Sequence, residues 1–120
     1  MRVGLRTVGE VTVVVVNGDI TITDTGSTPL ADTVRDLLAR HRAHLVLDLA
    51  HVHYIDSAGL GELVHALAAA RNRGGTMALV HVSRRLHEML QVTRLLTAFD
   101  CFDDEAAAVA SVARPGPRAV

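Results

Sequence analysis

Hydrophobic positions along the chain fall into short blocks that predict alternating strands and helices. Residues 11–16 are rich in β-branched side chains and predict a strand. A weaker block, 3–8, precedes it across Gly9-Glu10, a spacing that suits a tight hairpin. Residues 45–49 carry apolar side chains at nearly every position, which is typical of a strand buried on both faces of a parallel sheet. Residues 77–82 predict the next strand and 98–102 a last short one.

Two longer helices are predicted, each marked by its own boundary signal. The first begins at Thr28-Pro29, a capping hydroxyl followed by proline at the first helical position. The second begins near residue 58 and ends at Arg73-Gly74-Gly75, where glycines suit a helix C-terminus. On the first helix, Asp36 and Arg40 are spaced for an ion pair on a solvated face. Its apolar face is expected to hold Leu30, Val34, Leu37, Leu38 and His41.

The C-terminal third of the chain predicts two shorter helices and a tail. Ser83 can cap a helix that carries Leu86, Met89 and Leu90 on its inner face. Asp103-Asp104-Glu105 places acids at the positive end of an Ala- and Val-rich helix. Residues 113–120 contain two prolines and a glycine and are expected to be a disordered tail, so that the domain spans 1–112.

The order of these elements predicts an α/β fold. Repeated strand–helix–strand units imply right-handed crossovers and a largely parallel sheet. The N-terminal hairpin adds one antiparallel strand, so the sheet is expected to be small and mixed. A chain of 120 residues suits one domain.

Composition narrows the classes of function. The net charge is −1 and aromatic residues make up 2% of the chain, so we expect neither a basic field for nucleic acid nor stacking platforms for single strands. Cys101 is the only cysteine, which rules out an internal disulfide and suggests a packed thiol. No signal peptide is recognisable and no apolar run is long enough to span a membrane, so a cytoplasmic protein is expected.

The string Ile55-Asp56-Ser57-Ala58-Gly59-Leu60-Gly61 joins the buried strand at 45–49 to the second long helix. It places a hydroxyl, Ser57, beside a carboxylate, Asp56, where free N–H groups and the positive end of the helix dipole favour an anion. The glycines at 59 and 61 are expected to leave the hydroxyl unshielded. Ser57 could therefore be a nucleophile, a helix cap or a phosphate acceptor.

Several kinds of catalytic or cofactor site lack support in the sequence. The string before Ser57 lacks the first glycine of a nucleophile elbow. His51 and His53, with Asp48 and Asp56 near in sequence, match no metal signature, and the other histidines are scattered. Neither a complete dinucleotide fingerprint nor a phosphate-binding Walker loop is present. We therefore expect no catalytic residue, no metal and no cofactor.

The Asp-Ser-x-Gly-Leu-Gly string after a buried strand closely resembles the STAS domain family, and within it the bacterial anti-sigma factor antagonists. The resemblance covers about residues 11–112. Gly18-Asp19-Ile20 also resembles the Gly-Glu-Leu-Asp element that follows the family's second strand. The resemblance implies a small mixed, mostly parallel sheet with helices packed largely on one face.

The resemblance also implies a mechanism of partner switching. The unphosphorylated protein would bind an anti-sigma factor that is a serine kinase and so free a sigma factor. The kinase would phosphorylate Ser57, a serine phosphatase would reverse the modification, and a weak homodimer is a further option. The residues expected to bind the partner are Asp19, Thr21, Asp24, Asp56, Ser57, Ala58, Gly59, Leu60, Gly61 and Glu62.

One position departs from the family pattern. Thr21 stands where the family carries an acid that helps to frame the phosphate acceptor, and Asp24 follows three residues later. Neighbouring hydroxyls at Thr21, Thr23, Thr25 and Ser27 offer rival acceptors. The alternative is therefore a STAS scaffold not switched at Ser57, either a subunit of a sensory complex or an accessory subunit of a lipid transporter.

Overall fold

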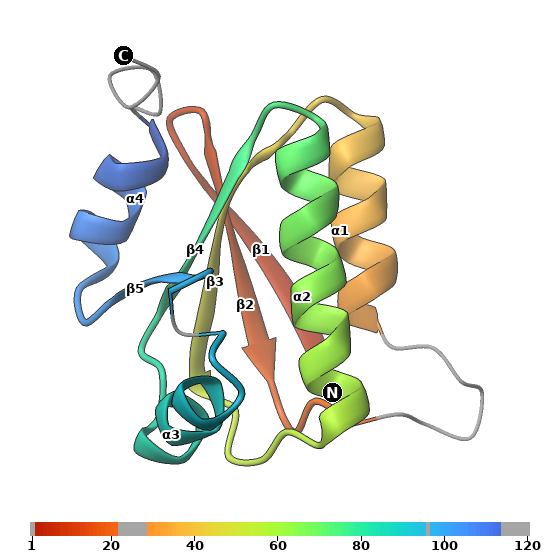
Figure 1. Cartoon of the computed structure of the whole chain (residues 1–120). Helices are drawn as coiled ribbons and strands as arrows, with labels where there is room; N and C mark the ends of the chain where they lie inside the picture. Colours follow the sequence, from red (N-terminus) through yellow and green to blue (C-terminus); the bar gives the residue numbers. More distant parts are fainter. Residues whose placement is uncertain (1, 22–28, 96, 114–120) are drawn as a thin grey trace.

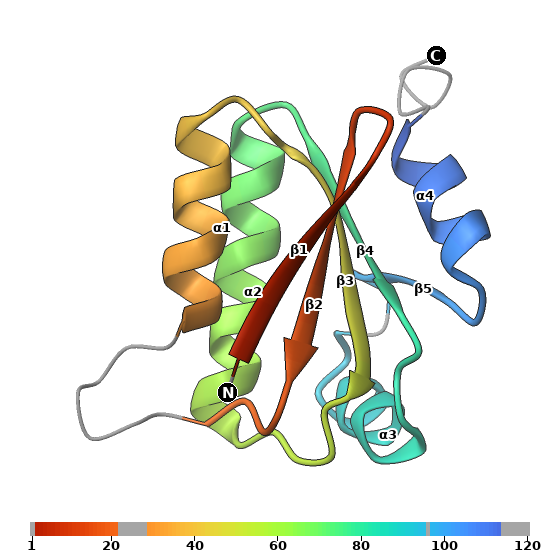
Figure 2. The ribbon, with the colours of Figure 1, turned by 180° about the vertical axis from the view of Figure 1, so that it is seen from behind.

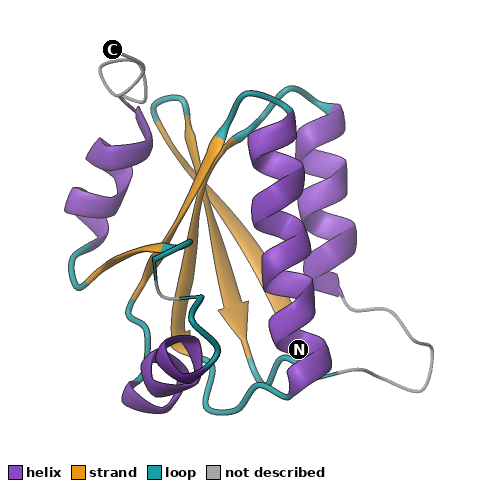
Figure 3. Ribbon diagram, viewed as in Figure 1, coloured by secondary structure: helices purple, strands orange, loops and turns teal. Residues whose placement is uncertain are grey.

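The structure, a computed structural model, describes residues 2–21, 29–95 and 97–113. Within these ranges, strands and helices follow one another in the predicted order (Figures 1 and 3). The elements are β1 Arg2–Val8, β2 Val11–Asn17, α1 Pro29–Ala39, β3 His44–His51, α2 Ser57–Asn72, β4 Thr76–Val80, α3 Arg84–Val92, β5 Asp100–Phe102 and α4 Glu105–Ala113.

The five strands form one mixed sheet in the order β1-β2-β3-β4-β5. β1 is antiparallel to β2, and the other neighbouring pairs are parallel. Val8 pairs with Val11 across the two-residue turn, in which Gly9 has a φ of 60°. Glycine adopts this left-handed conformation without strain, which explains why the hairpin is tight. The predicted hairpin and parallel sheet are confirmed.

Helices cover the two faces of the sheet unequally. α1 and α2 lie side by side on one face, while α4 lies on the other (Figures 1 and 2). The larger core cluster joins the sheet to α1, α2 and α3 and includes Leu45, Leu47 and Leu49 from β3. A smaller cluster beneath α4 contains Val46 of β3 and Val112 of α4. The expectation of helices largely on one face is confirmed.

The prediction of the apolar face of α1 was wrong at one residue, His41. Leu30, Val34, Leu37 and Leu38 are buried, but His41 is exposed because the helix ends at Ala39. His41 has a φ of 63° and donates its backbone N–H to Leu38 O, while Arg42 N–H donates to Leu37 O. These paired hydrogen bonds are the Schellman termination, which turns the chain away from the helix.

Smaller departures occur at other element ends. The strand predicted over 77–82 ends at Val80, because His81 takes a left-handed backbone with a φ of 59°. α4 runs to Ala113, one residue beyond the predicted domain end, and residues 114–120 lie outside the described part of the chain. Cys101 is half-buried against the core, and burial, followed by the charge of Asp100, raises the pKa of its thiol.

Candidate functional site

The start of α2 is held by backbone bonds to the segment that follows β2. Ile20 and Ile55 form an isolated parallel bridge. Ile20 N–H donates to Tyr54 O at 3.0 Å, and Asp56 N–H donates to Ile20 O at 3.3 Å. Both isoleucine side chains are buried. The residues around Asp19 and those around Ser57 are therefore neighbours, at the end of the sheet where parallel α/β folds bind ligands.

Gly59 lets the helix approach this segment closely. A Cβ on Gly59 would overlap the carbonyl carbon and oxygen of Ile20, whereas a Cβ on Gly61 would meet no atom within 4 Å. Ser57 is exposed, as expected, and the structure adds a reason for Gly59 that the sequence did not show. Its lack of a side chain serves the packing of α2 against Ile20.

Asp56, and not Ser57, is the N-cap of α2. Asp56 has an extended backbone, with φ −92° and ψ 177°, and its Oδ1 accepts the N–H of Gly59 at 2.6 Å. Ser57 is the first helical residue and is exposed. Of the three roles that the sequence left open for Ser57, the structure assigns helix capping to its neighbour and leaves its hydroxyl at the surface.

The first turn of α2 offers N–H groups to an anion. Asp56 satisfies Gly59, but among the residues that the structure describes nothing accepts from the N–H of Ser57 or Ala58. Free N–H groups at a helix start, together with the helix dipole, favour a negative group at this position. A phosphate on Ser57 is thus compatible with the fold.

The predicted contact residues separate into a surface set and a supporting set. Asp19 and Ser57 are exposed, and Thr21, Asp56, Ala58, Gly61 and Glu62 are partly exposed. Gly59 is buried and Leu60 is only 7% exposed, so these two hold the turn in place. Asp24, like the rival acceptors Thr23, Thr25 and Ser27, lies outside the described residues.

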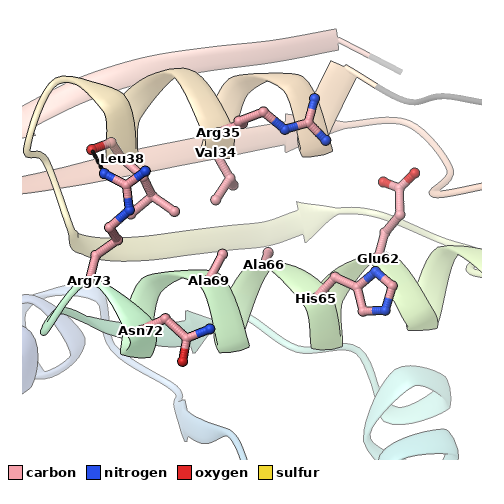
Figure 4. A pocket seen from close by; sticks show the side chains of 9 residues that line it. All are labelled: Val34, Arg35, Leu38, Glu62, His65, Ala66, Ala69, Asn72 and Arg73. Atoms are coloured by element: carbon pink, nitrogen blue, oxygen red, sulfur yellow. Dashed lines mark hydrogen bonds between the residues drawn. The ribbon is translucent and has the colours of Figure 1, made fainter.

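A groove that the sequence did not reveal lies between α1 and α2 (Figure 4). Its volume is about 360 Å³, and Val34, Leu38, Ala66 and Ala69 contribute its apolar lining. The polar lining consists of Arg35, Glu62, His65, Asn72 and Arg73. Such a groove depends on how two helices pack, which periodicity within each helix does not specify. Glu62 is its point of contact with the predicted partner surface.

The described ranges lend no support to metal binding or to a helix that crosses a membrane. There, no group of three or more His, Cys, Asp or Glu side chains could hold a metal ion. None of the described helices has the length and apolar character that crossing a membrane requires.

Comparison with known proteins identifies the family. The family model described as "Mlab, STAS domain" matches residues 3–99. The chain belongs to the STAS domain family. The family match ends before β5 and α4, so the helix on the second face of the sheet lies outside it.

Curated relatives in the STAS family carry the name of anti-sigma factor antagonists. The chain is 30% identical over 66 residues to the anti-sigma F factor antagonist of Paenibacillus polymyxa, covering 55% of this chain and 56% of the relative. It is 35% identical over 63 residues to the anti-sigma-B factor antagonist of Bacillus subtilis (strain 168), covering 52% and 58%. The alignments thus span less than two thirds of these relatives.

Solved structures of other proteins share the fold of this chain. A putative anti-sigma factor antagonist from Thermotoga maritima has a TM-score of 0.84 at 26% identity, covering 93% of this chain and 95% of the other. The anti-sigma factor antagonist SpoIIAA in its unphosphorylated form has a TM-score of 0.72 at 15% identity, covering 94% and 99%. A sulfate transporter family protein from Wolinella succinogenes reaches 0.71 at 22% identity, covering 90% and 88%. At the last two identities the likeness concerns the fold alone.

Proposed function

We propose that this STAS domain is an anti-sigma factor antagonist whose binding is switched off by phosphorylation of Ser57. In the unphosphorylated state it binds an anti-sigma factor that is also a serine kinase, and a sigma factor is released. The main observation in support is that Ser57 is exposed at the start of α2. Asp56 caps the helix, so the Ser57 hydroxyl is not needed as a cap. The names of the curated relatives support the same kind of partner.

The chemistry of the switch is phosphoryl transfer, and the chain supplies the acceptor. The Ser57 Oγ forms a bond to the γ-phosphorus of ATP as the bond from that phosphorus to the β–γ bridging oxygen breaks. The hydroxyl proton passes to a base of the kinase, and ADP is the leaving group. The first turn of α2 can accommodate the product, because the N–H groups of Ser57 and Ala58 have no acceptor among the described residues and a helix start favours an anion. A serine phosphatase returns the hydroxyl by hydrolysis.

Loss of binding after phosphorylation follows from charge. A kinase places nucleotide phosphates against the acceptor oxygen, so the transferred group remains beside the negative diphosphate. Phosphoserine brings about −1.5 to −2 charges, and Asp56 and Asp19 are already close in the fold. Like-charge contacts in an interface cost several kcal/mol, enough to break a tight complex.

The test combines intact mass with binding. The protein is incubated with ATP and each serine-kinase anti-sigma factor of the same genome, and wild type is compared with Ser57→Ala and Ser57→Asp. Ser57→Ala should fold, bind and accept no phosphate, because Asp56 provides the cap. Ser57→Asp should fold and bind at least about tenfold more weakly, since an unpaired interface charge is costly. A phosphate detected on the Ser57→Ala variant would show that another hydroxyl is the phosphate acceptor.

Hydrogen exchange tests where the partner binds. Protection on adding the anti-sigma factor should fall on residues 19–27 and on the first turn of α2. The Ile20–Ile55 bridge holds the described start of that segment beside α2. Protection confined to the opposite end, around Gly74-Gly75, would contradict this location.

A second candidate function is an accessory STAS subunit that is not phosphorylated. It is favoured by Thr21, which stands where the antagonists' pattern has an acid, and by the MlaB description of the matched family model. Such a subunit would serve a sensory complex or a lipid transporter, and Ser57 would be a fixed contact. The neighbouring genes distinguish the two candidates. Finding genes for a permease and an ATPase there would support this one, and finding genes for a kinase-type anti-sigma factor and a sigma factor would support the first.

A further inference from the structure

One aromatic side chain on the loop between β3 and α2 is exposed. Tyr54 is 46% exposed, while Val52 and Ile55 of the same loop are buried. It is the only tyrosine in the chain, which has just three aromatic residues. Exposed tyrosines are enriched among the few residues that dominate binding energy at protein interfaces. Tyr54, two residues before the cap of α2, is therefore a candidate contact residue for a protein partner.

Tyr54 shares a shallow cleft with the start of α3. His53 and Tyr54 line it from the loop, Ser83 and Arg85 line it from α3, and Leu86 is buried beneath. In Figures 1 and 2 this loop passes between α3 and the start of α2. Tyr54, which lines the cleft, comes three residues before Ser57 on the same loop.

The two sides of this end of the sheet carry opposite charge. Asp19 and Asp56 lie on the side of Ser57. On the other side, Arg84 and Arg85 are exposed in the first turn of α3, whose cap Ser83 accepts the N–H of Leu86. Arg85, which lines the cleft, adds its charge to the positive end of this helix and favours an acidic partner segment. Charges of opposite sign on the two sides would orient a partner.

We propose that Tyr54 and Arg85 form a second contact region for the anti-sigma factor, which rests on the proposed function above. The partner presents a carboxylate to the Arg85 guanidinium and an apolar side chain to the Tyr54 ring. Arginine pairs with carboxylates through two parallel hydrogen bonds, and tyrosine supplies contact area at low entropic cost. This region lies beside Ser57 without including it, so it fixes the orientation in which the hydroxyl meets the kinase.

The experiment titrates the nucleotide-free serine-kinase anti-sigma factor into wild type and variants by calorimetry. Tyr54→Ala and Arg85→Ala should each weaken binding at least about tenfold, as interface anchors do. The controls are Arg84→Ala, which removes the same charge outside the cleft, and Val92→Ser, which removes an apolar side chain that is 82% exposed on α3. Both controls should stay within about twofold of wild type. Tyr54→Phe keeps the ring and should retain most of the affinity.

The outcomes separate this proposal from the one on which it rests. Wild-type affinity for Tyr54→Ala and Arg85→Ala overturns the second contact region while leaving the Ser57 switch in place. Equal losses for Arg84→Ala and Arg85→Ala also overturn it, because the effect would then be one of net charge. If wild type binds none of the kinases, both proposals fail. Unfolding midpoints in urea identify any variant that does not fold, and Tyr54→Gln then replaces Tyr54→Ala.

Discussion

The carbonyl oxygen of Ile20 occupies the space that a side chain on Gly59 would need. The same oxygen accepts the N–H of Asp56, so it joins the β2 segment to the turn that precedes Ser57. Gly59→Ala would place a methyl group against backbone, which cannot move aside as a flexible side chain can. Overpacking of this kind costs about 1–3 kcal/mol, and we expect Gly59→Ala to lie at the upper end of this range.

Gly61→Ala is the matched control for this packing. It lies on the same helix, and its added methyl would meet nothing within 4 Å. Alanine is favoured over glycine in a helix by about 1 kcal/mol, so Gly61→Ala should stabilise the protein by up to that amount. Urea unfolding of both variants measures the difference. Equal midpoints for the two would show that the contact between α2 and Ile20 does not constrain Gly59.

Capping by Asp56 predicts a loss of stability that depends on the chemistry of the side chain. Asp56→Ala leaves the Gly59 N–H without the acceptor that now lies at 2.6 Å, and should cost about 0.5–2 kcal/mol. Asp56→Asn keeps a capping oxygen and should lose only a few tenths of a kcal/mol. Urea midpoints check both values. A midpoint for Asp56→Ala equal to wild type would remove the capping role from Asp56.

Helix ends show what the sequence could and could not predict. α2 ends with Gly74 in the left-handed region, at a φ of 75°, and glycine made that end predictable. α1 and α3 end in the same way, but with His41 and Arg94 at φ values of 63° and 61°. In α3, Leu95 N–H donates to Leu90 O and Arg94 N–H to Gln91 O, the pattern seen at the end of α1. No residue type marks these two ends, so His41 was assigned to the apolar face.

The candidate site was predictable in its position but not in its internal roles. Apolar blocks and the Asp-Ser-x-Gly-Leu-Gly string located the strand, the turn and the helix. Which of Asp56 and Ser57 caps α2 depends on backbone conformation, and the purpose of Gly59 depends on Ile20, thirty-nine residues earlier in the chain. The cleft at Tyr54 likewise requires α3 to pack beside the loop. Contacts between distant segments carry this information, and local patterns do not.

A pH-dependent contribution to stability is expected where α4 meets β1. Arg6 donates to both carboxylate oxygens of Glu105, at 2.6 and 3.0 Å, and its guanidinium lies 4.0 Å from Asp48. The hydrogen bonds from Arg6 are the main reason that the pKa of Glu105 is lowered from its ordinary value of 4.5. A carboxyl group with a lowered pKa in the folded state stabilises the protein above its unfolded pKa, and this stabilisation is lost as the pH falls through the folded value.

Glu105→Gln should therefore be less stable than wild type at pH 7, and the difference should shrink below about pH 4.5. Urea midpoints of both proteins between pH 7 and pH 3 measure this convergence. Glu88→Gln is the control, because Glu88 is exposed on α3 and forms no ion pair with any other described residue. The difference between Glu105→Gln and wild type should change more with pH than the difference between Glu88→Gln and wild type. A Glu105→Gln difference that persists at pH 3 would assign the effect to packing.

Thr21 is placed to influence phosphorylation of Ser57. It follows Ile20, whose backbone is bonded to Tyr54 and Asp56, so residue 21 is held beside the start of α2 and is partly buried there. The family resemblance implies an acid at this place, where this chain has Thr21. A carboxylate that hydrogen-bonds in the kinase complex contributes about 1.5 kcal/mol or more, equivalent to about tenfold in rate. Thr21→Asp should thus raise the rate of phosphate transfer to Ser57 about tenfold.

Two variants make the result of Thr21→Asp specific. Thr21→Asn matches the size of aspartate without its charge and should leave the rate within about fivefold of wild type, since a neutral hydrogen bond typically contributes about 1 kcal/mol. Thr21→Asp combined with Ser57→Ala should accept no phosphate, because the acid acts on the Ser57 hydroxyl. If Thr21 is itself the acceptor, Thr21→Asn loses the phosphate that Ser57→Ala retains. Intact-mass time courses with one kinase distinguish these outcomes, and equal rates for Thr21→Asp and Thr21→Asn would show that charge at this position does not frame Ser57.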